Sequence, residues 1–270
     1  MQPNSGLTEK IVSPIVTNLY QKDLNKREHS IQGIAIGLTI IGLWAGSLIF
    51  WISLDLSQVQ IFWIIAAIAS QTFLYTGLFI TAHDAMHCSL FPQNRQINHL
   101  IGRVAVFLYA LFSYQKLLKN HWLHHHHPAS ETDPDFYDSN FLGWYFNFFR
   151  RYFSIMQISG LGIIFHLLNY FRIFDAENMF LFWVIPSLLS SVQLFYFGTY
   201  LPHRKPEGGY TNPHRCQSNS LSTFWSFITC YHFGYHEEHH EYPHLPWWQL
   251  PIIRKQRIAD LTQTWDIVRW

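Results

Sequence analysis

The stretch GIAIGLTIIGLWAGSLIFWISL, residues 33–54, contains no charged side chain. An α-helix rises about 1.5 Å per residue, so a helix of this length crosses the roughly 30 Å hydrocarbon core of a bilayer. Three further stretches of similar character follow, at residues 59–82, 152–170 and 179–201. One such stretch is compatible with a buried helix of a soluble protein, but four of them in 270 residues predict an all-α integral membrane protein.

Composition and charge support this class. Charged residues make up 13% of the chain, against about 25% in typical soluble proteins, and the net charge of +1 argues against a nucleic-acid partner. The three cysteines have no CxxC spacing, which predicts free thiols in a reducing compartment. Residues 1–30 lack the apolar core of a signal peptide, so we expect a cytoplasmic N-terminal segment followed by one membrane-embedded domain at 31–270.

The basic residues predict the orientation in the membrane. With four transmembrane helices and both termini in the cytoplasm, 17 of the 18 Lys and Arg residues fall on the cytoplasmic side, as the positive-inside rule expects. The apolar run VAVFLYALFSYQ, residues 104–115, is too short to cross, and we expect an interfacial or re-entrant helix there. The expected fold is therefore four transmembrane helices plus this short helix, with a histidine-rich cap on the cytoplasmic side.

Three histidine clusters converge on that side in this topology. They are HDAMH (83–87), HWLHHHH (121–127) and YHFGYHEEHH (231–240). Within each cluster the spacing is i, i+3 or i, i+4, which places the imidazoles on one face of a helix. Eight histidines follow this pattern: His83, His87, His121, His124, His125, His236, His239 and His240. Eight imidazoles suffice for two metal ions, and imidazole suits zinc, copper, iron and nickel.

Four further histidines, outside the repeated spacing, are expected in or beside the site. His203, in YLPHR directly after the fourth apolar stretch, lies at the depth of the clusters, and we expect it to be a ninth ligand. His126, His127 and His232 fall outside the repeated spacing and are expected to flank the site. A poly-histidine tract by itself is often a surface feature. Three spaced clusters at the ends of apolar stretches instead predict one shared metal site.

Carboxylates accompany the clusters. A ligating imidazole usually donates its second N–H to a carboxylate, a carbonyl or water. Asp84 lies inside the first cluster and Asp133 and Asp135 follow the second, so these three are the candidates for orienting imidazoles and moving protons. Glu237 and Glu238 are equally compatible with solvated positions.

The strings HDAMH, HWLHH, DPDF, YLPHR and CYHFGYHEEHH followed by PHLPWWQLP resemble the bacterial-type β-carotene ketolases of the fatty-acid-desaturase-like membrane di-iron superfamily. The resemblance implies that the nine histidines bind two iron ions in a desaturase-like catalytic domain. It implies oxidation of the C4 methylene of β-ionone rings, from β-carotene to echinenone and canthaxanthin, with O2 and electrons from an external donor such as ferredoxin. Cys88 and Ala129 stand where relatives commonly have glycine.

The residues agree with this chemistry. An allylic C–H bond requires a redox-active metal, and zinc has no redox chemistry. The chain has no haem-attachment motif, dinucleotide fingerprint or ferredoxin-type cysteine spacing, so electrons must come from another protein.

Alternative functions also fit the histidine boxes. A carotenoid ring hydroxylase or a fatty-acid desaturase has the same three boxes. A metal transporter or another non-redox metal-binding membrane protein is disfavoured because only His166 lies within a predicted span. A zinc-dependent membrane hydrolase needs fewer ligands than this chain offers.

Overall fold

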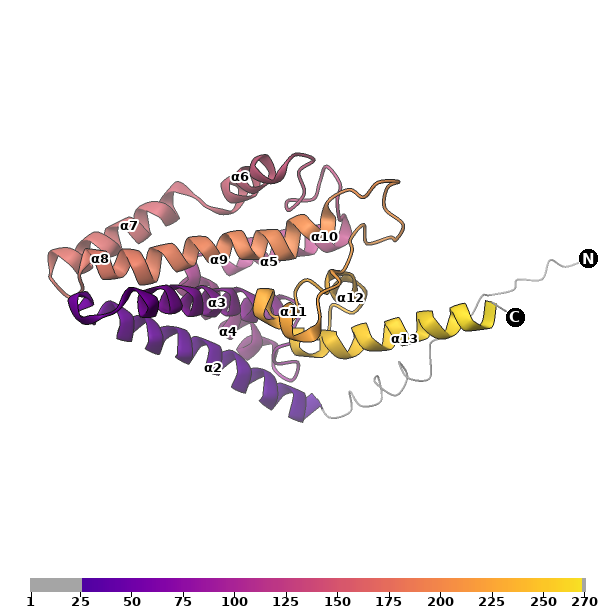
Figure 1. Ribbon diagram of the computed structural model, residues 1–270, viewed down its shortest axis with the longest axis horizontal. Coiled ribbons are helices and arrows are strands. Elements are labelled where there is room, and N and C mark those ends of the chain that lie inside the picture. Colours follow the sequence, from indigo (N-terminus) through magenta and orange to yellow (C-terminus); the bar gives the residue numbers. More distant parts are fainter. Residues whose placement is uncertain (1–25, 269–270) are drawn as a thin grey trace, which may run out of the picture.

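The computed structural model describes residues 26–268, with side chains described for residues 29–260, and this part of the chain is helical without any strand. Two long helices open it, α2 (Lys26–Ile52) and α3 (Ile61–Met86), joined by the short turn η2 (Leu56–Gln58). A third long helix is continuous from α8 (Ala176–Met179) through η3 (Phe180–Val184), α9 (Ile185–Phe195) and η4 (Tyr196–Tyr200) to α10 (Leu201–His203). α3 packs between α2 and α9 (Figure 1).

These three helices agree with the first, second and fourth apolar stretches of the sequence. By length and composition, His29–Ile52, Ile61–Met86 and Ala176–His203 are each able to cross a membrane. Large apolar side chains such as Leu43, Ile49, Ile61 and Ile65 are more than half exposed. An apolar helix surface of this kind is suited to lipid. The chain is therefore a helical membrane protein.

Two bent helix pairs complete the bundle. α4 (Arg95–Ala110) and α5 (Tyr114–His126) meet at 103°, and α6 (Phe141–Tyr152) and α7 (Ile155–Tyr170) meet at 80°. If each pair is one broken span, the number of spans rises from three to five. The short apolar run at 104–115 contains the first of these bends, at Leu111, whose backbone is left-handed with φ 55°.

The third apolar stretch differs from the expected single helix starting at residue 152. Tyr152 is instead the last residue of α6, and Phe153 is extended. Ser154 then caps α7 through a reciprocal hydrogen-bond pair with Gln157. A capping box of this kind starts a new helix, and the 16 residues of α7 extend only about 24 Å.

Two π-helical turns interrupt the third long helix, each shortly before a proline. η3 precedes Pro186 and η4 precedes Pro202. Proline lacks an N–H and its ring clashes with the carbonyl four residues earlier, and a wider turn relieves this clash. The second of these turns places Gly198 and Thr199 in the wall of an internal cavity.

Buried hydrogen bonds fix α3 against α9. The Thr76 hydroxyl lies 3.0 Å from that of Ser190 and donates to Gln193 Oε1 at 2.7 Å. The Gln193 amide donates in turn to the carbonyl of Thr229, at 2.6 Å, in α11 (Thr223–Cys230). Interhelical hydrogen bonds between small polar residues are a common means of association in membranes.

The chain ends with three elements: α12 (His236–Glu241), η5 (Trp247–Gln249) and α13 (Leu250–Val268). Figure 1 shows α10, α11 and α12 gathered at one end of the bundle. The histidines of α5, α10 and α12 lie at this end.

Tyr231 and His232 of the third histidine cluster, with φ 48° and 62°, adopt left-handed backbone conformations, and so do two residues that follow the first and second clusters. The latter two are Cys88, with φ 56°, and Ala129, with φ 49°. This conformation brings Cβ close to the following carbonyl and costs roughly 1–2 kcal/mol per residue, whereas glycine adopts it freely. Glycine would therefore be less strained than the present side chain at positions 88 and 129.

Replacing Ala129 by glycine is expected to raise stability by up to about 1 kcal/mol, because relief of the left-handed strain exceeds the added entropy of the unfolded chain. Ala105→Gly, in the middle of α4, is the matched control and should lower stability by about 1 kcal/mol. Thermal unfolding of both variants in detergent measures the difference. A lower unfolding temperature for Ala129→Gly would contradict the strain at this position.

Candidate metal centre

Four helix ends meet to form the site. The last turn of α3 carries His83, and His87 is the residue that ends this helix. α5 carries the second histidine cluster, α10 ends at His203, and α12 carries the third cluster. Segments separated by more than 100 residues of sequence are thereby brought together at one end of the bundle.

Five imidazoles form a first group, in which the ligand nitrogens all lie within 4.8 Å of one another: His83, His87, His121, His125 and His239. The Nε2 atoms of His87 and His121 are 2.6 Å apart, and those of His125 and His239 are 3.0 Å apart. His87, His121 and His125 are half-buried, while the other two are buried.

Four imidazoles form a second group by the same distance criterion: His124, His203, His236 and His240. All four are buried. His240 Nε2 lies 3.1 Å from Nε2 of both His124 and His236. The nine histidines expected as ligands are thus all present, and they divide between the two groups.

The division differs from the expectation that each helical segment presents its imidazoles in one direction. Successive residues of a helix are rotated by about 100°. His124 and His125 therefore point to different groups, and so do His239 and His240. Each of these two segments contributes to both groups, which places the groups side by side.

The outer nitrogens of several imidazoles are held by the protein. His203 Nδ1 lies 3.0 Å from the Arg215 carbonyl, and His236 Nδ1 lies 3.3 Å from the Phe233 carbonyl. A carbonyl only accepts, so each Nδ1 carries the proton and each Nε2 presents a lone pair to the group.

The inner nitrogens fit a bound cation. Buried Nε2 atoms of His83 and His203 have no hydrogen-bond partner, and such orphaned atoms are costly inside a protein. Burial holds the pKa of His236, His239 and His240 well below the usual histidine value, so these imidazoles are neutral. Neutral imidazoles with converging lone pairs are the donor set that transition metals prefer.

Asp133 behaves as expected of an orienting carboxylate. Its two oxygens lie 3.1 and 3.0 Å from His124 Nδ1, and it also accepts from the backbone N–H groups of Ala129 and Asp135, both at 2.8 Å. Burial by itself would raise the pKa of Asp133, but the hydrogen bond and charge of His124 together with the Asp135 N–H outweigh burial and lower that pKa.

Asp84 and Asp135 have different surroundings. Asp84 lies 3.4 Å from His83 Nδ1 and accepts a hydrogen bond from the Trp247 N–H at 3.1 Å. It therefore connects the first histidine cluster to the segment that follows the third histidine cluster. Asp135 accepts a hydrogen bond from the Tyr152 hydroxyl and lines the cavity beside His124. Burial raises the pKa of Asp135 to about 6.

The two glutamates of the third cluster hold α12 rather than an imidazole. Glu238 is fully buried and pairs with Arg254 of α13 at 2.9 Å. Glu237 pairs with Arg257 at 2.5 Å. A solvated position is therefore wrong for Glu238.

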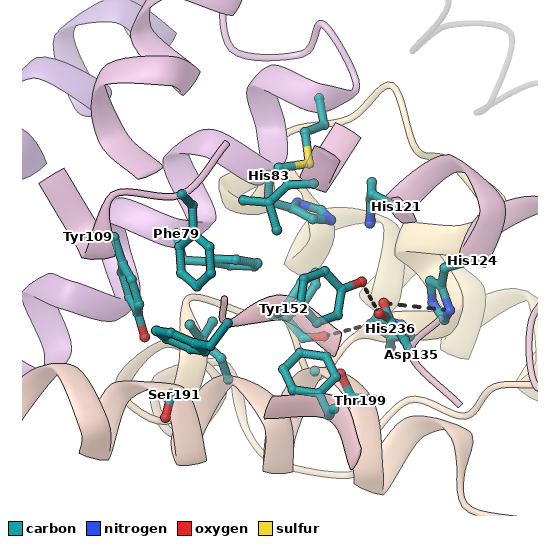
Figure 2. A pocket seen from close by; sticks show the side chains of 18 residues that line it. Phe79, His83, Tyr109, His121, His124, Asp135, Tyr152, Ser191, Thr199 and His236 are labelled. Atoms are coloured by element: carbon teal, nitrogen blue, oxygen red, sulfur yellow. Dashed lines mark hydrogen bonds and ion pairs between the residues drawn. The ribbon is translucent and has the colours of Figure 1, made fainter. Parts of the chain in front are cut away.

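A cavity opens onto both groups. Its metal-facing end is formed by His83 and His121 of the first group and by His124 and His236 of the second (Figure 2). Most of the remaining wall is apolar and aromatic: Phe79, Met86, Tyr109, Phe112, Leu117, Phe148, Tyr152, Phe153, Leu194 and Phe233. The site therefore suits an apolar molecule that presents one end to the histidines.

Sequence reasoning missed several residues of this wall. Tyr152 was assigned to a membrane span, yet its hydroxyl bonds to Asp135 inside the cavity. Phe233 lies between His83 and His236, with ring centroids 4.6 and 5.1 Å away. Tyr152 could have been expected to face a polar site, because it is an aromatic residue with a hydroxyl at one end of an apolar run. No local pattern in the sequence marks Phe233 as a residue of the cavity wall. His126, His127 and His232 lie outside both groups, as expected.

The fold and the site define a helical membrane protein with a histidine-rich centre suited to metal ions. A sequence model of the fatty acid desaturase family matches residues 57–178 and 158–265. A β-carotene ketolase of Paracoccus sp. (strain PC1) is 39% identical over 227 residues, which cover 80% of this chain and 92% of that protein.

Two algal proteins are similar as well. β-Carotene 4-ketolase 3 of Haematococcus lacustris is 37% identical over 83% of this chain and 79% of its own length. Zeaxanthin 4-ketolase of Chlamydomonas reinhardtii is 39% identical over 83% of this chain, which spans about half, 53%, of that protein. The chain belongs to the β-carotene ketolases within the fatty acid desaturase family, which confirms the resemblance drawn from its motifs.

Gly198→Ala is expected to destabilise the protein by about 1–3 kcal/mol, because overpacking of this size forces neighbours to move. A Cβ at this position would lie 2.4 Å from the Phe233 ring, which packs on two imidazoles. Thermal unfolding measures the loss, and adding Phe233→Leu should recover part of it. Gly162→Ala, where a Cβ meets nothing within 4 Å, is the control and should be neutral or slightly stabilising.

Proposed function

We propose that this protein is a β-carotene 4-ketolase, which oxidises the C4 methylene of β-ionone rings to a ketone and converts β-carotene to echinenone and canthaxanthin. The observation that carries the proposal is that two adjacent histidine groups face the same apolar cavity. The similarity to curated β-carotene ketolases over most of the chain supports the same reaction.

The donor set suits two iron ions. The five imidazoles of the first group would hold one ion and the four of the second group the other. Iron supplies redox chemistry that activates O2 towards a C–H bond, which zinc does not. Asp133 fixes the ring of His124 through its Nδ1–H, and such orienting partners strengthen metal binding by about tenfold to a hundredfold.

The cavity positions the substrate. A carotene is almost wholly apolar, so a ring in this cavity contacts mainly aromatic and aliphatic side chains. Its reactive carbon is held at the end of the cavity formed by His83, His121, His124 and His236. The same walls exclude water from that end, which protects a reactive oxidant from side reactions.

The reaction balances as two successive oxidations at one carbon. Each consumes one O2, two electrons and two protons, inserts one oxygen atom into a C–H bond and releases one water. The second product is a geminal diol, which loses water to give the ketone. Asp135, whose pKa burial raises to about 6, lies with Tyr152 in the cavity wall and is placed to hand protons to the reacting end. Asp84, which does not line the cavity, would assist proton movement on the side of the first group through His83, whose Nδ1 lies 3.4 Å away.

The electrons come from an external carrier, for which we propose ferredoxin. The finer topology is part of the same proposal: four transmembrane helices, a re-entrant α4–α5 pair, and both termini on the cytoplasmic side with the histidine-rich cap. Residues 1–30 would be a cytoplasmic segment and 31–270 the catalytic domain. This arrangement leaves the metal centre at the cytoplasmic boundary, where a water-soluble donor has access to it.

Expression in a bacterium that accumulates β-carotene tests the function. Keto groups extend the conjugated system, so the cells should turn from yellow to orange-red and yield echinenone and canthaxanthin on chromatography. A parallel host that accumulates zeaxanthin tests hydroxylated rings, because one relative is named as a zeaxanthin ketolase. Yellow cells containing only hydroxylated carotenoids would instead identify a ring hydroxylase, and unchanged carotenoids with altered lipids a desaturase.

His239→Ala should abolish ketone formation in the same host while leaving the protein in the membrane fraction. His239 belongs to the first group, and its Nε2 lies 3.0 Å from Nε2 of His125. The control is His127→Ala, because His127 is exposed and lies outside both histidine groups. Iron per chain, measured by plasma mass spectrometry, should fall by about half in the first variant and stay unchanged in the second. Full activity of His239→Ala would remove this residue from the ligand set.

A further inference from the structure

An exposed tryptophan stands directly against the first histidine group. The indole of Trp122 is 38% exposed. Its ring centroid lies 5.2 Å from that of His87 and 5.9 Å from that of His125, and both imidazoles belong to the first group. One aromatic ring therefore connects the protein surface to two of the candidate ligands, with no residue in between.

The surface beside Trp122 carries the positive charge of Lys119. Lys119 and His126, one turn before and one turn after Trp122 on α5, are both exposed. Residues three or four apart on a helix are neighbours, so these side chains share a face with the indole. We call this face, formed by Lys119, Trp122 and His126, the α5 face.

The sequence segment that contains α5 has no carboxylate. From residue 85 to residue 130 the sequence has no Asp or Glu, while it has four basic residues that are all exposed: Arg95, Arg103, Lys116 and Lys119. A cationic surface with an aromatic centre complements an acidic protein, because complementary charge speeds encounter and a partly exposed tryptophan supplies a strong contact.

We propose that the α5 face is the docking and electron-entry surface for a small acidic one-electron carrier protein of the iron–sulfur type. The proposal rests on the proposed function, which requires external electrons. In each encounter the reduced carrier loses one electron, which passes through the Trp122 and His87 or His125 rings to the site, and the carrier leaves oxidised. Two encounters supply the two electrons that each oxidation consumes.

Carrier binding provides the first test. The iron-loaded protein in phosphatidylcholine nanodiscs is titrated with a plant-type [2Fe–2S] ferredoxin, and affinity is measured by biolayer interferometry. Trp122→Leu should weaken binding about tenfold, as loss of a central tryptophan does at other interfaces. Lys119→Glu should weaken binding and reduce its dependence on salt.

Matched control variants distinguish a loss of carrier binding at the α5 face from the general effect of removing a surface tryptophan or reversing a surface charge. Trp63→Leu removes another exposed tryptophan, 20 residues before His83 and therefore about 30 Å along α3. Lys205→Glu reverses an exposed charge in the loop after α10. Both controls should bind the carrier as the unchanged protein does. Binding that responds equally to the controls would overturn the assignment to the α5 face.

Electron delivery provides the second test. Oxidation of reduced ferredoxin, followed by its absorbance, should slow in Trp122→Leu, whereas oxidation of dithionite and iron per chain should not change. Trp122→Phe, which keeps an aromatic ring, should recover part of the rate. Loss of iron, or equal slowing with both reductants, would show that the ring only supports the histidines and would overturn the proposal.

Anionic lipid is the competing occupant, because tryptophan and lysine also favour membrane interfaces. If Lys119→Glu affects only nanodiscs that contain phosphatidylglycerol, the α5 face contacts lipid and the proposal fails. The proposed function fails separately: a protein that binds and oxidises ferredoxin through Trp122 but forms no ketone has the docking surface without the ketolase reaction.

Discussion

The structure depends on holding nine imidazoles against one another where water is largely excluded. Ring nitrogens of different histidines face each other at 2.6–3.1 Å, and lone pairs this close repel unless a proton or a cation lies between them. Burial disfavours protonation of the α12 histidines, so a metal cation is the natural stabiliser. The limits of several helices coincide with this contact: His87 ends α3, His203 ends α10 and His236 begins α12.

Segments that supply no ligand nevertheless hold these rings. α12 has only six residues, and so short a helix is not stable by itself. It is fixed from outside by the ion pairs of Arg254 and Arg257 in α13 with Glu238 and Glu237. The charge of buried Glu238 is satisfied by Arg254 and by the Ser218 hydroxyl, and a buried carboxylate without such partners would be strongly destabilising. In HEEHHE, the glutamates Glu237 and Glu238 thus pair with arginines of α13, while the three histidines face the candidate metal centre.

The parts of this architecture that were predictable from the sequence are those set by local spacing. Apolar runs predicted the three long helices, the histidine spacing identified eight members of the two groups, and the position of His203 after the fourth apolar stretch identified the ninth. The break between Tyr152 and Ser154 was not predicted, because the run stays apolar across it and only the Ser154–Gln157 cap marks the new helix. The assignment of each imidazole to a group was not predictable either, because it depends on how α5 and α12 are rotated against α3. Phe233 acquires its role only when a π turn brings Gly198 against its ring.

A centre built almost wholly from neutral imidazoles suits its place at the end of a membrane bundle. Carboxylate ligands would carry charge into an apolar cavity, where an ionised group is expensive unless it is paired. Imidazoles avoid that cost before a metal binds. The few carboxylates present are each held by partners of their own: Asp133 by His124 and two backbone N–H groups, Asp84 by Trp247, and Asp135 by Tyr152. The two groups then differ in access, since all four histidines of the second are buried, whereas three of the five in the first are half-buried. In the proposed reaction the apolar substrate reaches the centre from the cavity, whereas electrons reach it through Trp122 at the protein surface.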